Sequence, residues 1–229
     1  MIHRIILILF SCSLLSLDKL SLESVQYYYQ KADSAKKQIQ IFHPLFIRQS
    51  AAIFNEWNIK TPILFHVVLS ENASAFGKLT GKNWDTASVF DATTDRFYFQ
   101  NIQSLQKQKI LHKTIRHELC HQMIFVKRKQ LTDFWLEEGF CEVVAGIVKS
   151  VKGLKLLQTI RTEQELKQFV VRNSKSNSKS NKNQAYQVSA MYVNYLLQKL
   201  GKQALLEMIV AGELRGDYYS GFYKEITSR

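Results

Sequence analysis

Short apolar runs separated by turn residues predict a few β-strands in the first half of the chain. Residues 61–70, TPILFHVVLS, are rich in Val, Ile and Phe, which is typical of a buried strand. The runs 86–91 and 96–101 flank Ala-Thr-Thr-Asp and predict a β-hairpin. Residues 75–85 contain two glycines and an asparagine, and they predict a loop.

Longer stretches around these strands have helical patterns. The stretch 21–57 is polar and is broken only by Pro44, which predicts two helices or one helix kinked at that proline. In residues 104–129, apolar side chains recur every three or four positions, which places them on one face of a helix. Ser104 can cap the start of that helix.

The chain after residue 131 is expected to be mostly helical. Thr132 or Asp133 can cap a helix that runs to about Lys149, and the ranges 185–200 and 202–211 predict two more helices. The segment 172–184, RNSKSNSKSNKNQ, has no apolar residue and predicts a disordered, solvated loop.

The N-terminus has the pattern of an export signal. A basic start at residues 1–4 precedes the uncharged run IILILFSCSLLSL, which is shorter than the ~20 residues that span a bilayer comfortably. We expect residues 1–20 to be a signal peptide, or a lipoprotein signal with Cys12 as the lipidated residue; a buried N-terminal helix is the alternative. The mature protein would then be periplasmic, secreted or lipid-anchored, with residues 21–229 forming one domain.

Composition limits the possible functions. The 229 residues include 46% apolar residues, and they carry a formal charge of +12. The basic residues are scattered without a nucleic-acid-binding signature, so we interpret the charge as a lysine-rich solvated surface. A surface that binds acidic glycans, anionic lipid or nucleic acid is the alternative. Cys120 and Cys141 are expected to be small buried apolar residues, although a bridge between them stays open.

The segment His117-Glu118-Leu119-Cys120-His121 is an HExxH pattern. Histidines four residues apart lie one helical turn apart on the same face, so both imidazoles can bind one zinc ion. Glu118 lies beside them, where its carboxylate can accept a proton from water activated by the metal. With this composition, such a pattern arises by chance in about one chain in a hundred. The alternative, a charged turn of a solvated helix, leaves the strong apolar face of this helix unexplained.

A catalytic zinc ion needs a third protein ligand from another element. The segment WLEEGF supplies Glu137 and Glu138, after a gap that allows a second helix to return. Glu142 lies four residues beyond Glu138 and can accept a hydrogen bond from a metal-binding histidine. Alternatively, these glutamates are acids near a helix start, where the helix dipole favours them.

HELCH followed by WLEEGFCE resembles the gluzincin metallopeptidases, in particular the aminopeptidase N type and the short peptidase-MA-like domains. In that pattern the glutamate before the glycine binds zinc, so the resemblance selects Glu138 and matches Glu142 to the supporting acid. It implies an α+β, thermolysin-like catalytic domain: a small sheet with an exposed edge strand packed on the active-site helix, then a mostly helical part. The resemblance covers about residues 61–211 and suggests 86–91 as the edge strand that binds an extended peptide.

Residues 186–190, YQVSA, and the later Leu-Gly resemble the tyrosine-plus-small-residue segment of that group. The resemblance implies that Tyr186 stabilises the oxyanion of the reaction; an ordinary helical tyrosine is the alternative, and Tyr192 and Tyr195 are weaker candidates. The Gly-Ala-Met-Glu-Asn stretch of the group's aminopeptidases has no equivalent near residues 74–91, which argues against aminopeptidase specificity. His112 lies five residues before His117 and is expected to point away from the metal.

We therefore expect a zinc metallopeptidase that hydrolyses peptides or proteins outside the cytoplasm. One Zn²⁺ would be bound by His117, His121 and Glu138, with Glu118 and Tyr186 as catalytic residues. The expected partner is a peptide or protein substrate and no specific nucleic acid, with membrane attachment through the N-terminus as an option. The alternatives are a non-catalytic zinc-containing binding or assembly protein, or a basic surface-binding module.

Overall fold

The computed structural model describes residues 17–228, except residues 61, 63, 84, 129–132, 147–154, 177, 213 and 215. The strands are β1 (Asp18–Leu22), β2 (Val25–Tyr29), β3 (Phe65–Leu69), β4 (Ser88–Asp91) and β5 (Arg96–Phe99). The helices are α1 (Ala32–Glu56), α2 (Ala73–Thr80), α3 (Ile102–Lys107), α4 (Leu111–Lys127), α5 (Phe134–Val144), α7 (Glu163–Ser174), α8 (Lys179–Leu200), α9 (Lys202–Ala211) and α10 (Tyr219–Thr227).

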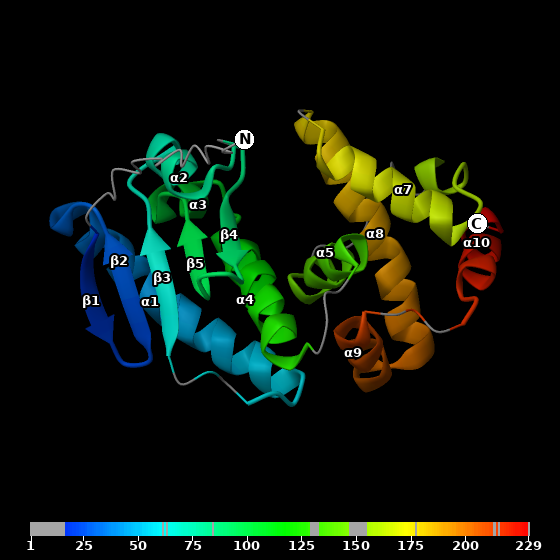
Figure 1. The fold of residues 1–229 in the computed structure, drawn as a ribbon, viewed down its shortest axis with the longest axis horizontal. Helices are drawn as coiled ribbons and strands as arrows, with labels where there is room; N and C mark the ends of the chain where they lie inside the picture. Colours follow the sequence, from blue (N-terminus) through cyan, green and yellow to red (C-terminus); the bar gives the residue numbers. More distant parts are fainter. Residues whose placement is uncertain are drawn as a thin grey trace, which may run out of the picture.

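These elements form two groups that lie side by side (Figure 1). The strands lie with α1 to α4 in the first group, and α5, α7, α8, α9 and α10 form the second. The first group holds a small mixed sheet, so the predicted α+β class is confirmed at this level. Buried side chains from both groups join in one hydrophobic core.

The sheet has the strand order β1-β2-β3-β5-β4. Its three inner strands are parallel, and the outer strands β1 and β4 run antiparallel to their neighbours. The predicted buried strand is present as β3, and the predicted hairpin is present as β4 and β5. β4 lies at an edge of the sheet, where the sequence placed residues 86–91.

Aromatic side chains fix α1 against one face of the sheet. Phe42 packs edge-on against Phe99 of β5, with ring centroids 4.8 Å apart, and Phe46 packs in the same way against Phe65 of β3 at 5.2 Å. Such edge-to-face pairs add a preferred geometry to the hydrophobic burial. Pro44 lies inside this helix, so of the two predicted alternatives the pair of helices is wrong and a single helix across the proline is present. The helical prediction is also wrong for the start of the stretch 21–57, which belongs to β1 and β2.

Strand β2 has an alternating pattern of burial that the helical interpretation of the stretch 21–57 missed. Val25 and Tyr27 of β2 are fully buried, and Gln26 between them is less so, which is the period of a strand. The predicted loop at 75–85 is also partly wrong, because α2 occupies its first half. Asn72 caps α2 by accepting a hydrogen bond from the Ala75 N–H, and Gly81 ends it with a left-handed φ of 67°.

The predicted helix 104–129 is two helices, α3 and α4. Lys109 has a φ of 59°, which an α-helix does not tolerate, and it separates them. The cap is Asn101, whose Oδ1 accepts a hydrogen bond from the Ser104 N–H at 3.0 Å, so the predicted cap at Ser104 is wrong.

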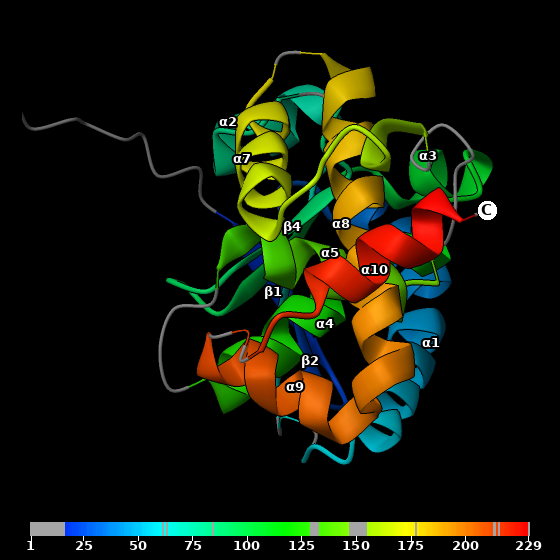
Figure 2. The same cartoon turned by 90° about the vertical axis from the view of Figure 1, so that its right-hand side faces the viewer.

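The other helices of the second group pack around α8. Helix α7 lies along the first half of α8, and α10 crosses α8 (Figure 2). The predicted helices 185–200 and 202–211 are confirmed, with Gly201 between them. The predicted loop at 172–184 is wrong over most of its length, because α7 continues to Ser174 and α8 begins at Lys179. Ser178 caps α8 by accepting a hydrogen bond from the Asn181 N–H, so a polar segment serves here as a helix start.

Most of the predicted signal segment lies outside the described residues, which begin at Leu17; residues 18–20 belong to β1. The signal peptide and the lipidation of Cys12 therefore stay predictions. Among the described helices, none combines the length and the apolar character that a membrane span requires.

Candidate metal centre

Two packed helices bring three potential ligands to one point. His117 and His121 lie one turn apart on α4, and Glu138 comes from α5. The Nε2 atoms of the two histidines are 3.1 Å apart, and Oε2 of Glu138 lies 3.4 Å from Nε2 of His117. The other Glu138 oxygen, Oε1, lies 3.8 Å from Nε2 of His121. One ligand atom from each residue lies within 4.8 Å of the others, so the group could hold a metal ion.

The spacing of these atoms fits a tetrahedral metal site. Ligand atoms at the ~2.0–2.1 Å bond lengths of zinc lie roughly 3.3 Å from one another around a tetrahedron. The 3.1 Å between the two Nε2 atoms and the 3.4 Å from Nε2 of His117 to Oε2 of Glu138 are close to that value. The 3.8 Å contact to Nε2 of His121 is made by the other carboxylate oxygen, Oε1. Two imidazoles and one carboxylate also leave a fourth position open for water or substrate, as catalytic sites of this kind require.

Each histidine has a carboxylate at its other ring nitrogen. Nδ1 of His121 lies 2.8 Å from Oε1 of Glu137, and Nδ1 of His117 lies 3.5 Å from Oε1 of Glu142. A carboxylate at Nδ1 favours a proton there, which leaves the Nε2 lone pair free to bind a metal. Both imidazoles are thus oriented with Nε2 toward Glu138.

Sequence reasoning placed Glu142 in this supporting role but considered Glu137 only as the rival of Glu138. The structure brings Glu142 to His117, and it gives Glu137 the equivalent position at His121. Adjacent residues on a helix point in different directions, so Glu137 and Glu138 reach opposite nitrogens of the same imidazole.

The electrostatics of the cluster favour a bound cation. Burial lowers the pKa of His117, but the carboxylates of Glu138, Glu118 and Glu142 outweigh it and raise that pKa to about 9. The same competition raises the pKa of His121. Burial raises the pKa of Glu138, and the two imidazoles outweigh it, so this pKa is lowered. The acids of the cluster therefore draw positive charge to the position that the Nε2 atoms face.

Glu118 is fixed on β4. Its Oε1 accepts a hydrogen bond from the Ser88 hydroxyl and its Oε2 accepts one from the Phe90 N–H, both at 2.6 Å. Glu118 is a buried residue of α4, with 5% of its surface exposed, and it lies next to His117. No sequence signal indicated Ser88, because it lies 30 residues away and on a different element.

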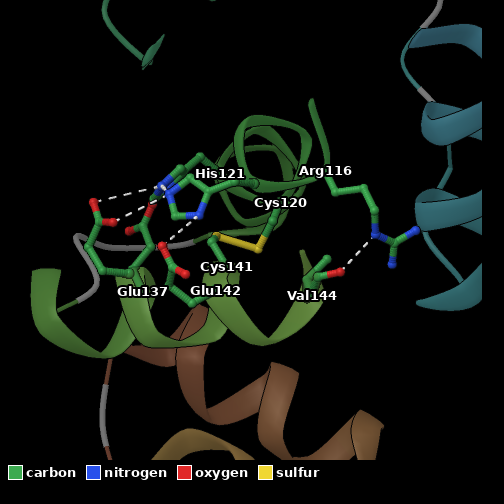
Figure 3. The surroundings of a disulfide bond; sticks show 9 residues. Arg116, Cys120, His121, Glu137, Cys141, Glu142 and Val144 are labelled. Carbon is green, nitrogen blue, oxygen red and sulfur yellow. Dashed lines mark hydrogen bonds and ion pairs between the residues drawn. A yellow bond between two sulfur atoms is a disulfide. The ribbon is translucent and has the colours of Figure 1, made fainter. Parts of the chain in front are cut away.

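A disulfide ties the two ligand-bearing helices together (Figure 3). Cys120 of α4 and Cys141 of α5 are both fully buried and are bonded to each other, with 5.3 Å between their Cα atoms. They are buried as the sequence predicted, and they form the bridge that it left open. Arg116 makes a second link on the far side of the bridge, since its Nε donates to the Val144 carbonyl oxygen at 2.9 Å.

Close packing against α8 fixes the position of α5. A Cβ atom on Gly139 would lie 2.8 Å from the carbonyl carbon of Ser189, so only glycine fits at that position. Ser189 in turn donates a hydrogen bond to the Trp135 carbonyl oxygen at 2.5 Å. Gly139 follows Glu138 directly, so this contact fixes where the Glu138 carboxylate lies relative to the two histidines. The same contact explains why the residue three positions after Tyr186, Ser189, is small.

Of the three candidate tyrosines, only Tyr186 lies in the cleft that contains the metal cluster. Burial raises the pKa of its phenol, and the carboxylates of Glu138 and Glu142 raise it further, so the hydroxyl remains a hydrogen-bond donor. Tyr192 instead donates to Glu163 at 2.7 Å, and it stacks with Tyr195 in an aromatic cluster of the second group.

The cleft has a volume of about 900 Å³. It is lined by β4 on one side and by α4, α5 and the start of α8 on the others. His117, Glu118, His121, Glu138 and Glu142 all face it. His112 is exposed and does not line it, in agreement with the sequence analysis.

No protein-family model and no curated protein matches this chain. The family resemblance therefore rests on the motif residues alone, and the gluzincin assignment stays a hypothesis.

Proposed function

We propose that this protein is a zinc metallopeptidase of the gluzincin type, with His117, His121 and Glu138 as the ligands. The observation that carries the proposal is the convergence of these side chains at tetrahedral spacing, with a carboxylate behind each imidazole. A bound zinc ion would supply Lewis acidity toward a carbonyl and would lower the pKa of a water molecule.

The other residues of the cleft have the chemistry that hydrolysis needs. Glu118 would accept a proton from the attacking water and deliver it to the departing amine. Its two hydrogen bonds to β4 hold it in place for both transfers. Tyr186 would donate a hydrogen bond to the oxyanion, since its phenol keeps its proton.

β4 would bind the substrate. It is an edge strand, and its Phe90 N–H points out of the sheet toward Glu118. A peptide added along this edge in extended form would therefore lie beside the proposed base. This arrangement supports the thermolysin-like character that the sequence suggested, with an internal peptide bond as the target.

We also propose that the protein works outside the cytoplasm. The N-terminal pattern predicted export, and the disulfide between Cys120 and Cys141 gives independent support. Structural disulfides form and persist in oxidising compartments and are rare in the cytosol.

The proposal is tested by metal analysis of the purified protein together with cleavage of a peptide library, with and without a chelator. We expect one zinc ion per chain and cleavage that the chelator stops and zinc restores. Glu118→Gln should retain zinc and lose at least about 100-fold in kcat, because it removes the proton acceptor but no ligand.

Two results would contradict the proposal. One is a zinc content that is the same in Glu138→Gln as in wild type, since zinc would then not be bound at the proposed ligands. The other is a Glu118→Gln variant as active as wild type. Full zinc content with no hydrolysis of any peptide would favour the non-catalytic zinc protein instead.

A further inference from the structure

The cleft around the metal cluster is lined by six basic side chains. They come from separate parts of the fold: the loop before β4, both ends of α4, and the region where α7 meets α8. The six are Lys82, Lys113, Arg128, Lys175, Lys179 and Lys182. Four of them, Lys82, Lys113, Lys175 and Lys179, are exposed to solvent.

The acids of the same cleft already have partners within it. Glu137, Glu138 and Glu142 face the histidines, and Glu118 is held by β4. Asp85 pairs with Lys182 at 3.4 Å. Within the described part of the chain, the four exposed lysines make no ion pair. Lys82 and Lys113 act through their charge on Glu138 and Glu142, respectively. Lys175 and Lys179 are therefore the exposed lysines best placed to meet an incoming molecule.

Helix stability does not explain the lysines at the start of α8. Lys179 and Lys182 lie in the first turns of α8, which has no acidic residue in its first turn. The positive end of the helix dipole disfavours cations there. Lys175 is the C-cap residue of α7, where the helix dipole favours a cation, and its side chain also faces the cleft. The two lysines at the start of α8 thus lie where the helix dipole opposes them.

We propose that the cleft selects peptides with acidic side chains near the scissile bond; this inference rests on the proposed function. Six basic residues face five acids, and a divalent ion would leave the cleft with a clear positive excess. In a concave site the field of such charges is concentrated, so an anionic peptide gains both association rate and affinity. Peptide carboxylates could pair with Lys175 and Lys179 while the chain lies along β4.

The test compares two peptides that share one cleavable sequence and differ in flanking Glu against Gln. We expect the zinc-loaded protein to cleave the Glu peptide with at least ~5-fold higher kcat/KM, an advantage that shrinks as salt is raised. The double variant Lys175→Glu/Lys179→Glu should abolish this preference. Lys36→Glu/Lys37→Glu makes the same change of charge on exposed positions of α1 and should keep the preference.

A binding measurement separates this inference from the proposed function. Glu118→Gln leaves peptides intact, so fluorescence anisotropy can report its affinity for the same two peptides. Tighter binding of the Glu peptide, lost in the α7–α8 double variant, supports the inference even if hydrolysis is absent. Equal binding and cleavage of both peptides would overturn the inference and leave the peptidase proposal intact. Tighter binding of single-stranded DNA than of the Glu peptide would also overturn it.

Discussion

Cys120 precedes His121 directly, and its disulfide partner Cys141 lies three residues beyond Glu138. The bond therefore connects the two helices at the level of the proposed ligands. Because both sulfurs are buried, we interpret this bond as a brace for the metal centre. It limits how far α5 can move from α4, and thus how far the carboxylate can move from the imidazoles.

Removing this brace should reduce stability. We expect Cys120→Ala/Cys141→Ala to lower the free energy of unfolding by about 3 kcal/mol, the value for closing a loop of this size. Urea denaturation of chelator-treated protein measures this without a contribution from zinc. The urea midpoint of wild type in a strong reductant should also fall, because the bond is reduced once the protein unfolds. An unchanged midpoint in the double variant would show that the bond does not stabilise the protein.

Gly139 should not tolerate even a methyl group. Alanine in a helix gains about 1 kcal/mol over glycine, but here its Cβ would press on the Ser189 backbone. Overpacking typically costs about 1–3 kcal/mol, and two close-packed helices cannot easily separate. We expect Gly139→Ala to destabilise the protein by about 2 kcal/mol and to weaken zinc binding, measured by thermal unfolding and competition with a chelator.

Ser189→Ala provides the control for this substitution. It removes the hydroxyl oxygen but leaves the Ser189 carbonyl carbon in place. The combined Gly139→Ala/Ser189→Ala variant should therefore recover only part of the lost stability. Full recovery would mean that the side chain, and not the backbone, restricts position 139.

The central motif could be predicted from sequence because its geometry is local. The spacing of His117 and His121 within one helix determines that they share a face, whatever surrounds them. Glu138 comes from another helix, and the spacing alone left Glu137 as a rival; only the family resemblance selected Glu138. The contact of Glu137 with Nδ1 of His121 could not be predicted, because it depends on how α4 and α5 pack.

The contacts that could not be predicted all join distant segments. Ser88 reaches Glu118 only because β4 lies along α4, which depends on the strand order of the whole sheet. The break at Lys109 was missed because the regular apolar pattern begins only at Leu111, and the polar residues before it contain no glycine or proline that would mark a turn. The polar start of α8 resembled a loop, since its side chains face solvent and the cleft instead of the core.

The metal-free protein should become less stable as pH rises toward 9. The pKa of His117 is raised from 6.5 to about 9 in the folded state. Such a group contributes stability that is fully present below 6.5 and is lost as pH rises through about 9. The loss is on the order of 3 kcal/mol if the unfolded histidine is normal. Urea titrations of chelator-treated protein at the two ends of this range measure it.

The histidine variant checks the origin of this pH dependence. His117→Gln has no titrating group at this position, so its stability should change less over the same range. His121 has a pKa shifted in the same direction and accounts for part of the remainder. Bound zinc should remove the pH dependence of stability in wild type, because the metal takes the place of the proton on His117. Equal slopes for wild type and His117→Gln would contradict the assignment.

Ser88 should act on catalysis through Glu118. Its hydroxyl and the Phe90 N–H each hold one oxygen of the carboxylate, so Ser88→Ala leaves the proposed base with a single tether. We expect kcat to fall about tenfold with KM and zinc content nearly unchanged, because positioning matters more than ground-state binding. Ser88→Thr keeps the hydroxyl, suits a strand and should restore most of kcat. Loss of stability in both variants, or a change in KM alone, would instead show that Ser88 serves the packing of β4 on α4.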